Sequence, residues 1–353
     1  SEFEHTVPAL YIHFANFFKN YFEKYFKGNK DIYDYHWSDE ELGDFTYFEG
    51  NAQAFRLLKK LQYTRDEHSI NLSFPVLATI MKYPHSSTSG NKKDMGVSYK
   101  KFGYFQSEFE SFDVIVNSLG MKINNKVRRH PLVFLLEAAD DIAYSVADIE
   151  DGCKKGLITL EVLKKKMYRY LDSSNPSEYE ILSTLENINV DPNYPQPLEV
   201  IASIFRIKIQ NFMIDASIKA FINNHDKILS GDFDMDLLDL SEAEGLKKAF
   251  KELGEILYNC KEVLKLELTG DKIITVLLEE FTKAITSPKR SRKGSKEEKL
   301  YNLISSNYRF LMEKYPDSEN KLYNELRLIT DFICGMTDSY ALDLYRSITA
   351  INI

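Results

Sequence analysis

The sequence predicts an all-α protein with a multi-helix fold. Wherever a periodicity is visible, apolar residues recur at spacings of three and four, as on one face of a helix. Few stretches alternate with a period of two, and no Asn-Gly or Asp-Gly pair separates two apolar runs. The composition, with 44% hydrophobic residues, 15 Gly and 10 Pro, is that of a folded globular chain and excludes a disordered or collagen-like one.

Three segments carry the helical periodicity most clearly. They contain Phe55, Leu57, Leu58 and Leu61; Ile201, Ile204, Phe205, Ile209, Phe212 and Met213; and Ile273, Leu277, Phe281 and Ala284. Stretches rich in turn-forming residues are predicted to be loops, at 84–103, 172–197, 230–236 and 286–299. We expect a body at 1–285, a basic loop at 286–299, and a C-terminal helical segment at 300–353 that packs on the body.

Charge and cysteine content exclude several classes of protein. The net charge of -8 offers no global attraction to nucleic acid or anionic lipid. The basic loop is interpreted as solvated, with a local phosphate contact as the alternative, through Lys289, Arg290, Arg292, Lys293 and Lys296. No apolar run approaches the roughly 20 residues of a membrane span. The three cysteines form no CxxC pair, so we expect a reducing, cytoplasmic location.

The most informative stretch is HPLVFLLEAADDIAYSVADIEDG, residues 130–152, which is predicted to be one helix from Pro131 to a stop at Gly152. One apolar stripe comprises Leu135, Ala138, Ile142, Val146 and Ile149. A second stripe advances in steps of four and places on one semi-buried face Leu132, Leu136, Asp140, Tyr144 and Asp148. A carboxylate in such a position normally has a cation or donor partner, so Asp140 is a candidate metal or polar-ligand residue; a solvated run of charges is the alternative.

Five segments together form a recognisable signature: FEGNAQAFRLL at 48–58, IMKYP at 80–84, KKFGYFQSE at 100–108, the helix at 130–152, and DFICGMTDSYALDLY at 331–345. In order and spacing they resemble the deoxyguanosine triphosphate triphosphohydrolases, members of the HD-domain superfamily of metal-dependent phosphohydrolases. The resemblance extends over nearly the whole chain. It implies an HD-domain-like all-α fold and hydrolysis of a dNTP, with dGTP favoured, to deoxynucleoside and tripolyphosphate.

The resemblance assigns roles to particular residues. Asp140 corresponds to the last ligand of a divalent metal, Mn²⁺ or Mg²⁺. Tyr144 and Asp148 correspond to residues that meet the deoxyribose, with Asp148 accepting a hydrogen bond from the 3′-hydroxyl. Asn51 and Gln53 border the nucleotide pocket, but their amides both donate and accept, so they do not decide the base preference.

The phosphate contacts are assigned in the same way. Lys82 corresponds to a triphosphate contact with Tyr83 beside it, and Arg206 lies where related enzymes place polar residues near the phosphates. The residues alone leave plainer alternatives open. Asn51 could cap a helix, Lys82 and Tyr83 could end a helix before Pro84, and Arg206 could pair with a core acid.

The signature departs from the family at its N-terminal side. The family's first metal-binding His and its adjacent His-Asp pair lie upstream of FEGNAQ, where this sequence has 47 residues and no such pair. The one His-Asp pair, His225 and Asp226, lies downstream in an unrelated context and is interpreted as a chance dipeptide. The family's catalytic His and Glu have no counterpart, so the catalytic residues stay unassigned. We expect an incomplete form of such an enzyme, through truncation, proteolysis or a missing N-terminal part.

Two other functions remain open on the sequence. One is an HD phosphohydrolase that acts on a different nucleotide. The other is a metal-free helical module that binds single-stranded nucleic acid such as DNA, or a protein partner. A bound divalent metal separates an enzyme of this family from a binding module. The family assembles as oligomers, so a homo-oligomer is expected.

Overall fold

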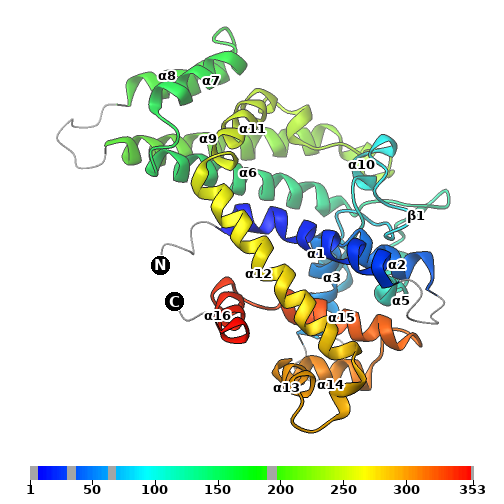
Figure 1. Ribbon diagram of the computed structural model, residues 1–353. Coiled ribbons are helices and arrows are strands. Elements are labelled where there is room, and N and C mark those ends of the chain that lie inside the picture. Colours follow the sequence, from blue (N-terminus) through cyan, green and yellow to red (C-terminus); the bar gives the residue numbers. More distant parts are fainter. Residues whose placement is uncertain (1–6, 30–36, 63–68, 189–196, 351–353) are drawn as a thin grey trace. The chain divides into compact units, whose positions relative to one another are not determined.

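The computed structural model describes residues 7–29, 37–62, 69–188 and 197–350. In that part of the chain sixteen α-helices and one pair of short strands form the regular structure, with short 3₁₀ and π segments between them (Figure 1). The strands β1 (Lys122–Ile123) and β2 (Lys126–Val127) are antiparallel. The predicted all-α fold class is therefore confirmed. No described helix combines the length and the hydrophobicity that a membrane span requires.

The chain divides into two compact units, and each is described by itself. The first comprises Pro131–Lys265 with the described residues among 1–9; the second comprises Leu10–His130 with the described residues from Leu266 onward. The two units do not test the predicted division into a body, a basic loop at 286–299 and a C-terminal segment, so that division stays a prediction.

The first unit contains α6 (Pro131–Lys154), α7 (Leu160–Tyr170), α8 (Pro176–Asn187), α9 (Pro197–Asn223), α10 (His225–Leu229) and α11 (Glu244–Tyr258). The second unit contains most of α1 (Val7–Asn29) and of α12 (Lys261–Thr286), together with α2 (Asp39–Thr46), α3 (Gly50–Arg56), α4 (Phe74–Ile80), α5 (Phe109–Ser118), α13 (Lys296–Leu303), α14 (Ser306–Lys314), α15 (Lys321–Cys334) and α16 (Asp338–Thr349).

The helix predicted at 130–152 is α6, and its predicted apolar stripe packs in the first unit. Ala138, Ile142, Val146 and Ile149 are each at most 5% exposed. The predicted stop at Gly152 is wrong, because α6 continues to Lys154. Gly152 is instead a point of close approach: a Cβ there would lie 2.6 Å from Leu257 of α11. The turn that follows α6 contains Gly156, whose φ of 69° favours glycine.

One predicted loop contains a helix. Within 172–197 the chain forms α8, so the prediction of a continuous loop is wrong. Asn175 caps this helix by accepting a hydrogen bond from the Ser177 amide at 3.0 Å, and Pro176 follows in the first turn. The Asn-Pro pair begins a helix here, because Ile181, Leu182 and Leu185 give it a buried face.

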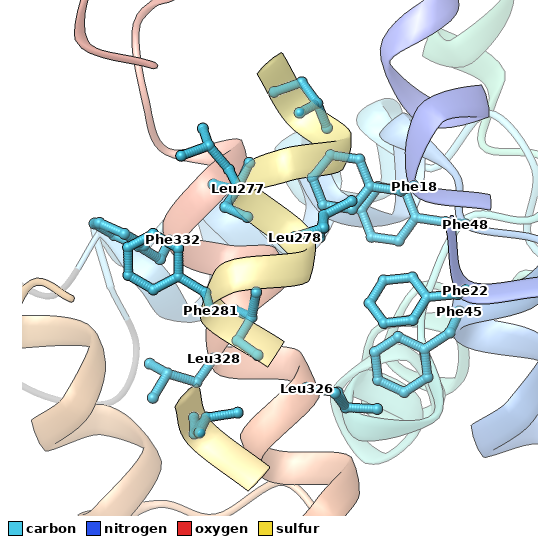
Figure 2. Packing of buried hydrophobic residues seen from close by; sticks show 14 of the residues in the cluster. Phe18, Phe22, Phe45, Phe48, Leu277, Leu278, Phe281, Leu326, Leu328 and Phe332 are labelled. Carbon is cyan, nitrogen blue, oxygen red and sulfur yellow. The ribbon is translucent and has the colours of Figure 1, made fainter. Parts of the chain in front are cut away.

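The core of the second unit is rich in phenylalanine and leucine (Figure 2). Residues of α12 and α15 pack there with aromatic rings of α1, α2 and the residues before α3; the labelled members are Phe18, Phe22, Phe45, Phe48, Leu277, Leu278, Phe281, Leu326, Leu328 and Phe332. The helical periodicity predicted around Leu277 and Phe281 is confirmed. Helix α15 is buried on all sides, since every residue from Leu322 to Ile333 is buried.

Helix α3 continues into a π-helical turn, η1 (Leu57–Leu61). The Gln62 amide donates to the Leu57 carbonyl at 3.2 Å, five residues back. This wider turn buries Leu61 and directs the Lys60 ammonium to the Tyr315 carbonyl, 2.7 Å away. Residues 57–61 are therefore helical as predicted, but with π rather than α geometry.

A buried ion cluster centred on Arg56 joins three of the signature segments. Its guanidinium donates to Asp331 at 2.7 Å, to Glu108 at 2.5 Å and to Asp317 at 2.7 Å. Burial acts to lower the pKa of Arg56, but the three carboxylates raise it well above its usual range, so the charge is permanent. The cluster therefore links the segment FEGNAQAFRLL, which contains Arg56, to the segments KKFGYFQSE and DFICGMTDSYALDLY.

Replacing Arg56 is expected to destabilise the second unit strongly. Arg56→Met removes the cation that three buried carboxylates share and leaves Glu108 without an ion-pair partner, which costs about 3–5 kcal/mol. Denaturant unfolding followed by the fluorescence of Trp37, the chain's one tryptophan, which contacts Phe26 in this unit, measures the loss. Arg292→Met, at an exposed position, is the matched control and should change stability by less than about 0.5 kcal/mol. Equal stability of the two variants would contradict a structural role for the cluster.

Candidate functional site

The predicted sugar and metal residues lie on one helix of the first unit. Asp140 and Asp148 of α6 are partly buried, whereas Tyr144 between them is 52% exposed. Steps of four residues place the three side chains along one face, with Tyr144 about 6 Å and Asp148 about 12 Å from Asp140 along the axis. Leu132 is 46% exposed, so the apolar continuation predicted for this face is only partial.

Two acidic residues of α6 have partners on α11. The Lys247 ammonium of α11 lies 3.6 Å from Asp141 and also pairs with Asp239 at 2.8 Å. The Tyr258 hydroxyl of α11 donates to Asp148 Oδ2 at 2.6 Å. Lys247 and Tyr258 are eleven residues apart, about three helical turns, so both lie on one face of α11.

Sequence reasoning missed both partners on α11. Their spacing in the sequence shows a shared face, but nothing in it shows which helix that face meets. The contact matters electrostatically for Asp148: burial raises its pKa above the usual range, while the hydrogen bond from Tyr258 acts in the opposite direction. Burial and the neighbouring carboxylate raise the pKa of Tyr258, so its hydroxyl stays protonated and remains a donor.

Arg206 of α9 pairs with an acid, although this acid, Glu150, is partly buried and not the core acid of the plainer alternative. Its Nε lies 2.8 Å from Glu150 of α6, and Glu150 also accepts from the Ser203 hydroxyl at 2.7 Å and pairs with Lys154 at 3.0 Å. The Arg206 side chain is still 36% exposed. A phosphate contact by Arg206 stays a prediction, and it requires exchange with the Glu150 pair.

Asp140 offers a carboxylate of the type that hard divalent cations prefer. In the described ranges, however, no three His, Cys, Asp or Glu side chains gather closely enough to hold a metal ion. His225 and Asp226 at the start of α10 are 53% and 102% exposed and contact each other at 3.2 Å, outside any such group. The described residues therefore do not complete a metal site around Asp140, and its metal role stays a prediction.

The other predicted residues belong to the second unit. Glu49 caps α3, and Asn51 donates its side-chain amide to Glu49 Oε1 at 2.8 Å, so Asn51 is not the cap. Gln53 is 8% exposed and uses both ends of its amide, donating to Asp331 at 3.0 Å and accepting from Arg327 at 3.2 Å. Gln53 thus belongs to the buried polar network beside the Arg56 cluster.

Lys82 and Tyr83 follow α4, which ends at Ile80, and lie in a tight loop. The chain after them packs against KKFGYFQSE: a Cβ at Gly103 would lie 2.2 Å from the Tyr83 carbonyl, so only glycine fits. The His85 amide donates to that carbonyl at 2.7 Å, and the Gly103 amide donates to the His85 carbonyl at 3.1 Å. The structure fixes this loop by its backbone, whatever the role of Lys82.

The imidazole of His85 is buried in this loop. It is 8% exposed and stacks on Tyr99 with 3.7 Å between ring centroids. Its Nε2 is buried without a hydrogen bond. Burial, helped by nearby Lys92, lowers the pKa of His85 from 6.5 to about 4.

The basic loop is partly tied to the second unit. Arg290 pairs with Glu325 at 2.9 Å and stacks over Tyr301, and Lys296 pairs with Glu280 at 2.5 Å. Lys289, Arg292 and Lys293 are exposed. Two of the five cations are thus used in intramolecular pairs, which favours the interpretation as a surface loop.

An open cavity of ≈ 640 Å³ in the second unit lies apart from the predicted residues. It is bounded by the π-helical turn and by the start of α16; its lining includes Leu57, Leu61, Phe332, Gly335, Thr337 and Tyr340. None of the predicted site residues lines it. The cavity therefore gives the predicted site no support.

Residues 244–347 match the family described as phosphohydrolase-associated domain. The chain is 36% identical over 316 residues to a deoxyguanosinetriphosphate triphosphohydrolase-like protein of Listeria monocytogenes, covering 88% of this chain and 66% of that protein. A like-named protein of Pseudomonas aeruginosa is 30% identical over 325 residues, covering 88% and 68%.

The chain belongs to the family of deoxyguanosinetriphosphate triphosphohydrolase-like proteins. A further relative, the deoxyguanosinetriphosphate triphosphohydrolase of Yersinia pestis, is 28% identical over 334 residues, covering 87% of this chain and 64% of that protein. The resemblance predicted from the five segments is thereby confirmed. The chain spans about two thirds of the length of the curated relatives it matches.

The buried imidazole of His85 predicts a pH-dependent stability. The folded protein holds it neutral down to about pH 4, whereas the unfolded chain binds a proton below about 6.5, so stability is lost as the pH falls between these values. The loss is about 3 kcal/mol at most. His85→Gln should remove this part of the slope in denaturant unfolding followed by Trp37 fluorescence.

The comparison isolates His85 because Asp44, whose pKa burial raises to about 7, titrates in both proteins. His225→Gln, which changes an exposed imidazole, is the control and should keep the slope of the parent. Identical slopes for the parent and His85→Gln would contradict the neutral buried imidazole.

Proposed function

We propose that the protein acts as a dNTP triphosphohydrolase, with dGTP favoured, and releases deoxynucleoside and tripolyphosphate. The observation that carries the proposal is the polar face of α6, where Asp140, Tyr144 and Asp148 share one side of the helix inside a chain of this family. Other nucleotides remain the alternative substrates, because the described contacts select no base.

The sugar is the part of the substrate that α6 is best arranged to recognise. A residue about 12 Å from Asp140 is at a suitable distance to meet a deoxyribose when Asp140 is near the α-phosphate. Asp148 can accept from a 3′-hydroxyl, and the exposed ring of Tyr144 can occupy the space that a 2′-hydroxyl needs. These two residues would therefore select a deoxynucleotide.

Lys82 is proposed to contact phosphate as a point charge, and Arg206 is proposed to contact it as a forked donor. Asn51 is proposed to contact the base or the sugar; its partly buried side chain donates a hydrogen bond to Glu49. Gln53 is proposed to act indirectly instead, because Asp331 and Arg327 already occupy its amide.

A divalent metal, Mn²⁺ or Mg²⁺, completes the proposal as cofactor. When bound it would activate water and neutralise charge on the phosphate. Asp140 is the one ligand proposed from the described residues, and the other ligands remain unassigned. A homo-oligomer is proposed on the family resemblance, whereas single-stranded DNA binding has no support beyond the three exposed cations of the basic loop.

Asp140→Ala is expected to lower kcat/KM for dGTP at least about a hundredfold, because it removes a metal ligand. The assay uses the protein expressed from its complete coding sequence, with Mn²⁺, and measures released deoxyguanosine and tripolyphosphate. Asp141→Ala is the matched control, since Asp141 pairs with Lys247 and has no proposed catalytic role. Absence of tripolyphosphate from the parent protein would contradict the proposed reaction, and equal loss in both variants would contradict the metal role.

Tyr144→Ala is expected to reduce the preference for dGTP over GTP about tenfold, because it opens the space beside the sugar. The ratio of the two kcat/KM values measures the effect. Tyr179→Ala, which removes an exposed ring of α8, is the control and should keep the ratio. Equal effects of Tyr144→Ala on dGTP and GTP would refute its role in sugar selection.

A further inference from the structure

Among the described residues, Tyr258 is the one that donates a hydrogen bond to the side chain of Asp148, the proposed sugar residue. It stands at the end of α11, and its hydroxyl donates to Asp148 Oδ2 at 2.6 Å. Both side chains are partly buried in the first unit. A short hydrogen bond to an ionised acceptor is strong and directional, so it fixes the orientation of the carboxylate.

The hydrogen bond leaves the two oxygens of Asp148 unequal. Oδ2 is occupied by the phenol, whereas Oδ1 accepts no hydrogen bond from any described residue. The Tyr258 hydroxyl keeps its proton at ordinary pH, because burial raises its pKa. Asp148 therefore presents one oriented oxygen to a ligand, at a fixed place along α6.

We propose that Tyr258 is a positioning residue, which orients the Asp148 carboxylate so that Oδ1 accepts from one hydroxyl of the ligand, the 3′-hydroxyl. The inference rests on the proposed function, since it takes Asp148 as the sugar residue. It adds the specificity determinant: Tyr258 controls discrimination between nucleotides with and without a 3′-hydroxyl, although it does not touch the substrate itself.

A merely structural role for Tyr258 has different consequences. The contact between α6 and α11 also contains the Lys247 pair with Asp141 and the close approach of Leu257 to Gly152. A phenol that only fastened these helices would affect stability and all ligands alike. Discrimination between two ligands that differ by one hydroxyl is therefore the decisive measurement.

The test compares Kd for dGTP and for 2′,3′-dideoxyguanosine triphosphate by calorimetry, with EDTA present so that no turnover occurs. Tyr258→Phe keeps the ring and removes the hydroxyl. It should lower the preference for dGTP about tenfold, chiefly by weakening dGTP binding. In an Asp148→Ala background the same change should leave the preference unaltered, because the carboxylate that it orients is gone.

Tyr170→Phe is the matched control. Tyr170 donates its hydroxyl to Glu252 of α11, so this change also removes a tyrosine-carboxylate hydrogen bond on the same helix. It should keep the preference for the 3′-hydroxyl. Melting temperatures of all variants separate loss of folding from loss of discrimination.

Two outcomes overturn the inference. A parent protein that prefers the 3′-hydroxyl, with Tyr258→Phe retaining that preference, overturns the role of Tyr258 alone. A parent protein that binds neither nucleotide, or binds both equally, overturns the proposed sugar role of Asp148 together with it.

Discussion

The second unit depends on the charge of one buried arginine. Arg56 lies at 3% exposure and binds carboxylates from three separate parts of the sequence. Burying a guanidinium is costly, and the cost is offset only while all of its acceptors are present. The segments that bear those acceptors, among them KKFGYFQSE and DFICGMTDSYALDLY, must therefore fold together. Several of the residues that mark the family signature hold this unit together and need not touch a substrate.

In the first unit, polar side chains of α6 hold neighbouring helices together, in addition to the binding role proposed for some of them. Asp141, Asp148 and Glu150 each meet a partner on α9 or α11. Their arrangement resolves an apparent conflict in the sequence, since a helix with a long buried stripe has little room for solvated acids. The acids lie at the edges of that stripe, where a neighbouring helix can supply a donor.

The sequence alone predicted the fold class, the course of α6 and its apolar stripe, because those follow from local periodicity. It predicted a loop in place of α8, since Asn and Pro begin helices as readily as they form turns, and the weak apolar pattern did not decide between them. The partners of Asp148, Gln53 and Arg206 could not be predicted, because each comes from a helix whose packing partner is set by the whole core. The roles of these residues toward a nucleotide stay predictions, whereas their intramolecular contacts are now known.

The distance along the chain between Arg56 and Asp331 has a consequence for synthesis on the ribosome. The two residues are separated by 275 positions, and residues 131–265 of the first unit lie between them. At about 5–20 residues per second, the ribosome needs on the order of ten seconds or more to make that stretch. For most of this time, Arg56 and the aromatic residues around Phe45 have been synthesised without α12 and α15. The N-terminal part of the second unit therefore cannot complete its core until α12 and α15 have been synthesised.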